Sequence, residues 1–435
     1  MTVSLAAFAV VGFLILILGS GVWVGLGLFG VGISSLMLFK NMPIDRLLAQ
    51  VSWNTLTSTE LIALPLFIFM AEILFRTKLS ASLFRGLAPW TTWLPGRLLH
   101  INVMGCTLFA AISGSSAATT ATVGRITLTE LLERGYDRDI AMGSLAGAGT
   151  LGFLIPPSVI MIIYGVLAQV SILKLFIAGV IPGLCLAGTY MIYLGVRARM
   201  NPDLVGKSTE VVTWAARITA LRHLGPVLFL IIAVLGSMYG GIASPTEAAA
   251  VGVFGALFVS IMQRSLTWEN FKDAVMGAAR TTSMVGLIIA GAVFLSTAMG
   301  FLGIPRFVAQ EIGALNLGPF ELIVVLLVFY GILGCVLEGL SSIVMTLSIT
   351  LPLVMSVGYD PIWFGVFVVL VVEMAQITPP VGFNLFVIQG LTGESIGRIA
   401  KAALPFFFIM ITFTILISIF PEIVMWLPNT VVLRG

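Results

Sequence analysis

A stretch of small and hydroxyl-bearing residues interrupts an otherwise strongly apolar sequence. It runs from Ser113 to Gly124 and reads SGSSAATTATVG. In hydrocarbon, such hydroxyl groups must bond to one another, to the backbone or to a ligand. Glycine lets the chain reverse, and small side chains let two helices approach closely. The stretch therefore predicts the tip of a helical hairpin near residues 113–119, forming part of a transport site.

The same features recur in the second half of the chain. Gly135-Tyr136-Asp137 returns as Gly358-Tyr359-Asp360, and Pro156-Pro157 returns as Pro379-Pro380, both at an offset of 223 residues. The same offset predicts a second hairpin tip near residues 338–342. Paired, interrupted apolar segments in two halves are typical of secondary transporters, whose sites lie where the repeats meet.

The two Pro-Pro pairs predict broken helices near residues 150–158 and 375–384. Consecutive prolines remove amide donors and free carbonyl oxygens, which membranes tolerate where they line a cavity or bind a cation. Such oxygen-lined cavities, facing the tips, suit sodium better than a divalent metal, which usually needs carboxylates. The half-helices that follow present free N–H groups to an anion, with Ser158, Gly382 and Asn384 in their first turns. The alternative is that each pair only kinks a helix and Ser158 caps it.

Carboxylates inside apolar segments are functional candidates. They are Glu60, Glu72, Glu247, Glu338 and Glu373. Glu338 is best placed because it lies at a predicted tip, whereas Glu72 and Glu373 are expected to hydrogen-bond between helices. Ser244-Pro245-Thr246-Glu247 has the spacing of a capping box, so a helix start explains it better than a ligand role.

Composition places these features in a membrane protein. The chain has 435 residues, of which 59% are hydrophobic and 9% charged, far below the quarter or so typical of soluble domains. Long apolar runs broken by Gly and Pro predict an all-α polytopic bundle with about eleven crossings. No charge precedes Lys40, so the first run is expected to be a retained span and not a signal peptide. The net charge of +3 forms no basic stripe that would favour nucleic acid.

A polar segment, residues 197–222, divides the chain into repeats at 1–196 and 223–435. Its excess of Lys and Arg predicts a cytoplasmic linker. If the repeats are inverted, both termini are periplasmic. Neither the three cysteines nor the two histidines have metal-ligand spacing, and no catalytic constellation or nucleotide-binding motif is present. The sequence therefore predicts no enzyme, but transport driven by an ion or solute gradient.

Three motifs together resemble one known family. Residues 112–117, 244–252 and 378–384 are similar to the large membrane subunit (DctM-like, M subunit) of TRAP transporters, the tripartite ATP-independent periplasmic carriers. The resemblance implies an inverted-repeat, elevator-type sodium symporter for C4-dicarboxylates or related organic acids in the bacterial inner membrane, with Na+ as coupling ion and no other cofactor. It also implies two partners, a small four-helix membrane subunit (Q-type) and a periplasmic solute-binding protein (P-type).

The resemblance also implies site residues. One sodium would bind Ser113, Ser115 and the backbone of Gly152, Ile155 and Pro157, and a second would bind Gly339, Thr378 and Val381. The candidate substrate contacts are Ser116, Thr119, Ser158, Ser341, Ser342, Gly382 and Asn384. Members often carry an acidic residue where Thr119 stands, so this chain departs from the pattern there. The alternative function is a stand-alone carboxylate carrier or anion channel that needs no binding protein.

Overall fold

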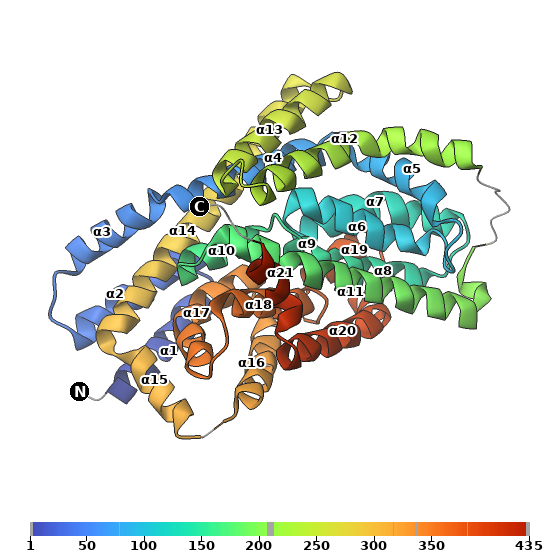
Figure 1. The fold of residues 1–435 in the computed structure, drawn as a ribbon. Helices are drawn as coiled ribbons and strands as arrows, with labels where there is room; N and C mark the ends of the chain where they lie inside the picture. Colours follow the sequence, from blue (N-terminus) through green and yellow to red (C-terminus); the bar gives the residue numbers. More distant parts are fainter. Residues whose placement is uncertain are drawn as a thin grey trace.

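The computed structural model describes residues 3–77, 79–206, 213–315, 317–335, 337–380 and 382–431. All regular structure in these ranges is helical (Figure 1). A helix satisfies its own N–H and C=O groups, as hydrocarbon requires. The prediction of an all-α polytopic protein is confirmed.

The helices of the first half are α1 (Val3–Gly19), α2 (Val24–Phe39), α3 (Ile44–Leu56), η1 (Thr59–Ile62), α4 (Ala63–Phe75), α5 (Leu79–Thr91), α6 (Leu99–Ser113), α7 (Ser116–Glu133), α8 (Arg138–Gly149), α9 (Leu151–Leu154), α10 (Val159–Ala168) and α11 (Ile172–Met200). Those of the second half are η2 (Pro202–Leu204), α12 (Trp214–Tyr239), α13 (Pro245–Met262), α14 (Trp268–Leu302), α15 (Ile304–Gly313), α16 (Pro319–Gly334), α17 (Gly339–Ser356), α18 (Pro361–Gln376), α19 (Phe383–Thr392), α20 (Ile396–Ile419) and α21 (Glu422–Thr430).

Fewer helices than expected are long enough to cross a membrane alone. Within the described ranges, seven helical segments have the length and apolar composition of a span, or up to eight if the bent pair α3 and η1–α4 counts as one. Several other apolar helices have only 10–17 residues. The expectation of about eleven crossings, with broken or re-entrant pieces besides, stays a prediction, because shorter apolar helices such as α1 with 17 residues and α2 with 16 are near the lower limit of a span.

Each half contains one hairpin and one broken helix, as the 223-residue repeat predicts. The hairpins are α6–α7 and α16–α17, and the broken helices are α8–α9–α10 and α18–α19. The repeated Gly-Tyr-Asp motif has the same role in both halves. Gly135 and Gly358 adopt positive φ after a helix ends, and the carboxylates of Asp137 and Asp360 cap the next helix. The Pro-Pro bonds that follow are cis in both halves.

The broken helices form the centre of the molecule. Every residue of α18 from Ile362 to Gln376 is buried, as is every residue of α8 from Ile140 to Gly149. Glycines allow α20 to lie directly on α8, since a Cβ on Gly147 would meet the Phe406 ring at 2.5 Å. The site predicted from the Pro-Pro pairs therefore lies on the most enclosed helices.

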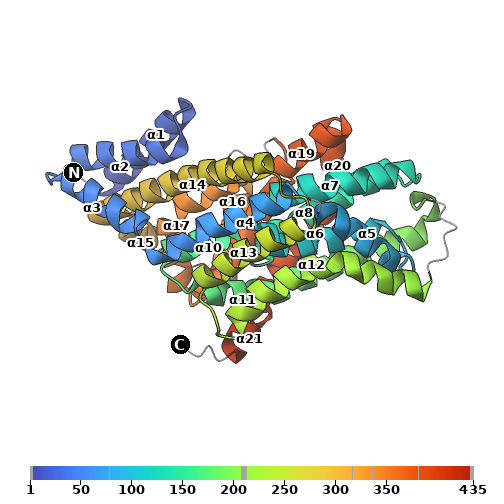
Figure 2. The same ribbon diagram turned by 90° about the horizontal axis from the view of Figure 1, so that it is seen from above.

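A layer of helices covers this centre along one side, with α4, α5, α12, α13 and α14 running beside one another (Figure 2). Close approaches at glycine hold the layer together. A Cβ on Gly25 of α2 would meet the α14 backbone at Leu287, and one on Gly86 of α5 would meet Leu224 of α12 at 2.5 Å. This layer supplies the wall that faces the two hairpins.

Charged segments gather at one end of the bundle. The Asp137 N–H donates to the Leu204 carbonyl, and Arg398 pairs with Asp139 at 2.7 Å. The polar linker is shorter than the predicted 197–222, because α11 continues to Met200 and α12 begins at Trp214. Residues 207–212 lie outside the described part of the chain.

Candidate functional site

The first hairpin turns over two residues. Helix α6 ends at Ser113, Gly114 adopts the left-handed conformation (φ 60°), and Ser115 caps the N-terminus of α7. The Ser113 and Thr119 hydroxyls lie 2.7 Å apart and join the two arms. Thr119 is fully buried, so its hydroxyl stabilises the tip in this conformation. Its proposed contact with substrate stays a prediction.

The tip rests against the first broken helix through backbone atoms. A Cβ on Gly114 would lie 2.7 Å from the Pro157 carbonyl oxygen, and one on Gly152 would lie 2.7 Å from the Ser115 carbonyl oxygen. Ile155 ends α9 between these two contacts. The structure therefore brings together the residues predicted for the first sodium site.

The second tip has a similar relation to α18. Gly339 begins α17, and a Cβ there would collide with Val372 and lie 3.6 Å from the Gln376 side-chain nitrogen. Thr378 lies two residues beyond the end of α18 at Gln376, and its hydroxyl donates to the Met374 carbonyl in the last turn of that helix. Val381, the third predicted ligand, lies outside the described residues.

The other predicted substrate contacts are mostly enclosed. Ser341 and Ser342 are buried in the first turn of α17, where the Ser342 hydroxyl donates to the Glu338 carbonyl. A Cβ on Gly382 would lie 2.8 Å from the Gln376 carbonyl oxygen, so only glycine fits there. The Ser158 hydroxyl accepts the Met161 N–H, so Ser158 is the N-cap of α10 as the simpler interpretation proposed.

Ser116 and Asn384 meet at the centre of the site although they belong to different repeats. The Asn384 side-chain amide donates to the Ser116 hydroxyl at 3.0 Å. The Glu373 carboxyl lies 2.9 Å from the same hydroxyl and accepts the Phe153 N–H at 2.7 Å. The prediction that Glu373 hydrogen-bonds between helices is confirmed. The sequence did not predict that it contacts the first hairpin tip.

A cavity of about 270 Å³ lies between the two tips and the outer layer. Its lining residues are Ile68, Ala71, Glu72 and Phe75 from α4; Phe109, Ser113, Ser115 and Ala118 from the first hairpin; Phe153, Val159 and Ile160 from the broken helix; Thr281, Met284 and Val285 from α14; and Glu338 and Leu340 from the second tip. Its size suits a small organic molecule. Glu72 is paired with Arg76 at 3.1 Å, while Glu338 is exposed.

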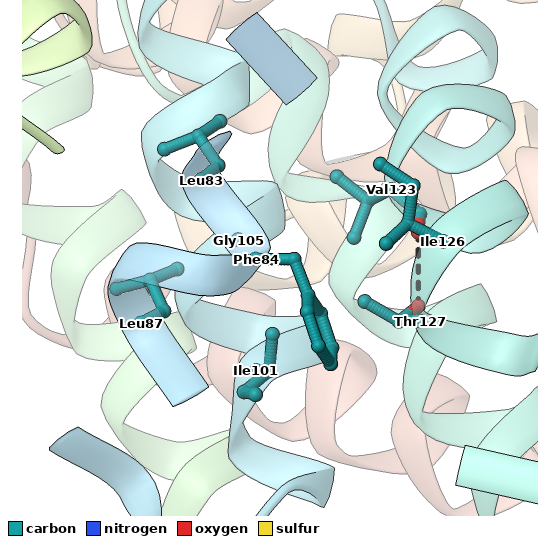
Figure 3. Close-up of a pocket in the computed structure, with 8 residues that line it drawn as sticks. All are labelled: Leu83, Phe84, Leu87, Ile101, Gly105, Val123, Ile126 and Thr127. Atoms are coloured by element: carbon teal, nitrogen blue, oxygen red, sulfur yellow. Dashed lines mark hydrogen bonds between the residues drawn. The ribbon is translucent and has the colours of Figure 1, made fainter. Parts of the chain in front are cut away.

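Two other cavities are poorer candidates. One of about 1180 Å³ opens between the α3–η1 turn, the α10–α11 turn and the start of α13. The candidate carboxylates Glu60 and Glu247 line it, but none of the predicted sodium or substrate ligands does. The Ser244–Glu247 capping box at its edge is present as predicted. The other, between α5 and the first hairpin (Figure 3), has about 10 Å³ and an apolar lining in which the Thr127 hydroxyl bonds the Val123 carbonyl. It has room for one water at most.

Sequence reasoning missed the residues that the outer layer contributes, except for Glu72 of α4. Phe75 and Met284 lack any motif, and nothing in their local sequence marks them as lining the site. Glu338 had been singled out by the repeat offset, and the structure places it in the cavity wall. Glu373 carried one available signal, as the only charged residue within α18.

Two hairpins packed on two broken helices, with a cavity between the hairpin tips, define a class of polytopic membrane transporter. A solved structure of similar fold is the YdaH transporter of Alcanivorax borkumensis, with a TM-score of 0.67 over 92% of this chain and 97% of that one, at 14% identity. The family model "Tripartite ATP-independent periplasmic transporter, DctM component" matches residues 10–423. The chain belongs to this DctM family, and the predicted membership is confirmed.

Curated relatives agree with this assignment. The C4-dicarboxylate TRAP transporter large permease protein DctM of Vibrio cholerae is 30% identical over 99% of this chain and 98% of its own length. The protein of the same name from Pseudomonas aeruginosa is 33% identical over 92% of each chain. The isethionate TRAP transporter permease protein DctMQ of Oleidesulfovibrio alaskensis is 32% identical over 95% of this chain and 64% of its own. The chain is thus a multi-pass membrane transporter component and not an enzyme.

Proposed function

We propose that this chain is the large subunit of a sodium-coupled importer of a small organic acid, such as a C4-dicarboxylate, in the bacterial inner membrane. The observation that carries the proposal is the cavity lined by both hairpin tips, with Ser115 on one side and Glu338 on the other. Both tips rest on broken helices, so the four elements form one packed unit. An elevator-type movement of this unit past α4 and α14 would carry the cavity across the membrane.

The way in which the tips contact the broken helices supports the proposed sodium coupling. The Ser115 and Pro157 carbonyl oxygens lie where Gly152 and Gly114 leave no room for a side chain. Backbone carbonyl and hydroxyl oxygens, with no carboxylate among the predicted ligands themselves, would suit a monovalent cation. A cation bound there would hold the tip that lines the substrate cavity, so each ligand would favour binding of the other.

The proposed partners are a small membrane subunit and a periplasmic solute-binding protein. Membership of the tripartite family supports both. The charged end near Asp137 and Leu204 is proposed to face the cytoplasm, because it adjoins the linker rich in Lys and Arg. The two termini would then lie on the periplasmic side.

Uptake into proteoliposomes tests the proposal. The chain, its small membrane partner and its binding protein would be offered radiolabelled succinate, isethionate or ectoine with and without an inward sodium gradient. Uptake that needs both sodium and the binding protein is the expected result. Uptake that ignores the binding protein would indicate a stand-alone carrier, and ohmic conductance would indicate a channel.

Variants at the first tip and at the break after α18 test the ion sites. Ser115→Ala and Thr378→Ala each remove one predicted oxygen ligand while the backbone contacts stay in place. We expect each variant to need roughly tenfold or more sodium for half-maximal uptake. Ser144→Ala, which removes a buried hydroxyl bonded to Asn102 at 2.8 Å outside the cavity, is the matched control. If Ser115→Ala and Thr378→Ala were both normally expressed and both kept the sodium dependence of the wild type, these ion sites would be refuted.

A further inference from the structure

Glu373 connects parts of the chain that carry the proposed ion and substrate sites. It lies on α18 of the second repeat and is 1% exposed. One carboxyl oxygen contacts Ser116, the first residue of α7, and the other accepts the Phe153 N–H in the middle of α9. Its two oxygens therefore join both sides of the first predicted sodium site, from a helix that supplies none of that site's ligands.

The contacts of Glu373 fix the backbone next to the predicted ligands. Phe153 follows Gly152 directly, and Ser116 follows Ser115 directly. A Cβ on Gly152 would lie 2.5 Å from the Ser116 Cα, so these two segments are in van der Waals contact. Any movement of the Glu373 carboxyl would change the distance between the tip and the broken helix.

The Ser116 hydroxyl extends this connection to the rest of the site. It lies 3.0 Å from the Gly149 carbonyl oxygen and accepts from the Asn384 amide. One small hydroxyl thus contacts α8, α18 and α19 together. Because all these groups are buried, removing one partner leaves the others unsatisfied.

The contact between a broken-helix carboxylate and a hairpin tip exists in only one of the two places that the repeat makes equivalent. The 223-residue offset pairs Glu373 with Thr150 and Ser116 with Gly339. The Thr150 hydroxyl donates to Gly147 of its own helix at 2.6 Å, and Gly339 has no side chain. A contact needed only to pack a tip on a broken helix would be expected in both halves, so this one points to a role at the first site.

We propose that Glu373 is a positioning residue that holds the first hairpin tip against α9 and thereby sets the sodium affinity of the first site from the opposite repeat. This inference rests on the proposed sodium coupling. Groups that orient metal ligands typically contribute a factor of roughly 10 to 100 to metal affinity. Glu373→Leu should therefore weaken sodium binding by at least roughly tenfold.

Glu373→Gln separates positioning from charge. The amide oxygen can accept the Phe153 N–H, and the amide nitrogen can donate to the Ser116 hydroxyl, which then donates to Gly149. All three contacts survive, so this variant should bind sodium within about threefold of the wild type, far less than the effect of losing an orienting group. Ser116→Ala removes the same contact from the other side and should resemble Glu373→Leu.

The test is thermal unfolding of the full chain in lipid nanodiscs, titrated with sodium chloride against choline chloride at constant ionic strength. Sodium itself is the probe, so the acid need not be known. We expect a sodium-dependent stabilisation whose midpoint is raised in Glu373→Leu and Ser116→Ala and recovered in Glu373→Gln. Ser144→Ala, which loses a buried hydroxyl bonded to Asn102 away from the tip, is the matched control.

The outcomes separate the two proposals. If Glu373→Leu lowers stability equally in both salts without moving the sodium midpoint, its role is packing alone and this inference is wrong, while sodium coupling stands. If Glu373→Leu does not fold, the sodium midpoint of Ser116→Ala is used instead, and an unchanged midpoint in that variant would show that the inference is wrong. If the wild type does not respond to sodium, the proposed coupling and this inference both fail.

Discussion

Replacing Gly152 by alanine tests whether the first tip must lie directly on the broken helix. The added Cβ would lie 2.5 Å from the Ser116 Cα and 2.7 Å from the Ser115 carbonyl oxygen. Both atoms belong to the backbone, so no side-chain rotation relieves the clash. The tip has to move away from α9, or the helix has to bend.

The size of the effect follows from these distances. The optimal separation of non-bonded carbon atoms is about 3.5–4.0 Å, so the tip must move by about 1 Å to relieve the contact between the new Cβ and the Ser116 Cα. Overpacking of this kind costs roughly 1–3 kcal/mol of stability. Binding geometry must be kept within about 0.5 Å, so a 1 Å displacement should also abolish most of the sodium response.

The assay is thermal unfolding in sodium and choline chloride, followed by sodium-dependent uptake. Gly188→Ala is the matched control, because Gly188 lies in the middle of α11 and a Cβ there meets nothing within 4 Å. Alanine is the better helix former, so this control should be neutral or slightly stabilised. If Gly152→Ala behaved like Gly188→Ala in both assays, the packed contact between tip and broken helix would be refuted.

Two further predictions concern charge. Glu338→Gln removes a negative charge from the cavity wall. At about 8 Å and an effective dielectric constant of about 40, this removes roughly 1 kcal/mol of repulsion from an anionic substrate, so uptake should be half-saturated at an acid concentration about fivefold lower. A higher half-saturating concentration, or loss of sodium dependence, would instead show that Glu338 holds the cation. Outside the spans, a hydrogen bond from Arg138 and the nearby Arg398 keep the pKa of Glu394 below its ordinary value of 4.5. A carboxyl group whose pKa is lowered in the folded state stabilises that state at pH values above 4.5, and this stabilisation is lost as the pH falls through the lowered pKa. The melting temperatures of wild type and Glu394→Gln should therefore differ near neutral pH and converge below pH 4.5. Parallel curves of melting temperature against pH across this range would contradict the ion pair.

Local chemistry explains how much of the fold could be predicted from sequence. Hairpins and broken helices were recognisable because Gly, Pro and runs of hydroxyls interrupt apolar segments, and hydrocarbon tolerates such interruptions in few ways. The repeat offset then located the second tip from the first. The number of crossings stays a prediction, because apolar length alone does not distinguish an arm such as α16 from a full span.

The candidate site was predictable only in part. Ser113 and Ser115 carry a local signal, whereas Gly152 was implied by the family resemblance, and the structure places Gly152 against Ser115. The role of Ser158 was ambiguous from sequence, because the same hydroxyl could cap a helix or bind a ligand. The structure shows that it caps α10. Phe75 and Met284 line the cavity from the outer layer, and their local sequence resembles any other apolar span.

The sequence by itself determined that this is an apolar helical protein of two related halves, each with a tip and a broken helix. Those properties follow from residue type and spacing within short segments. Only the tertiary structure decided which segments meet. Glu373 and Ser116 are 257 residues apart, and their contact depends on how the second repeat packs on the first. No local pattern contains that information, because the energy of such a contact arises from burial and partners supplied by distant parts of the chain.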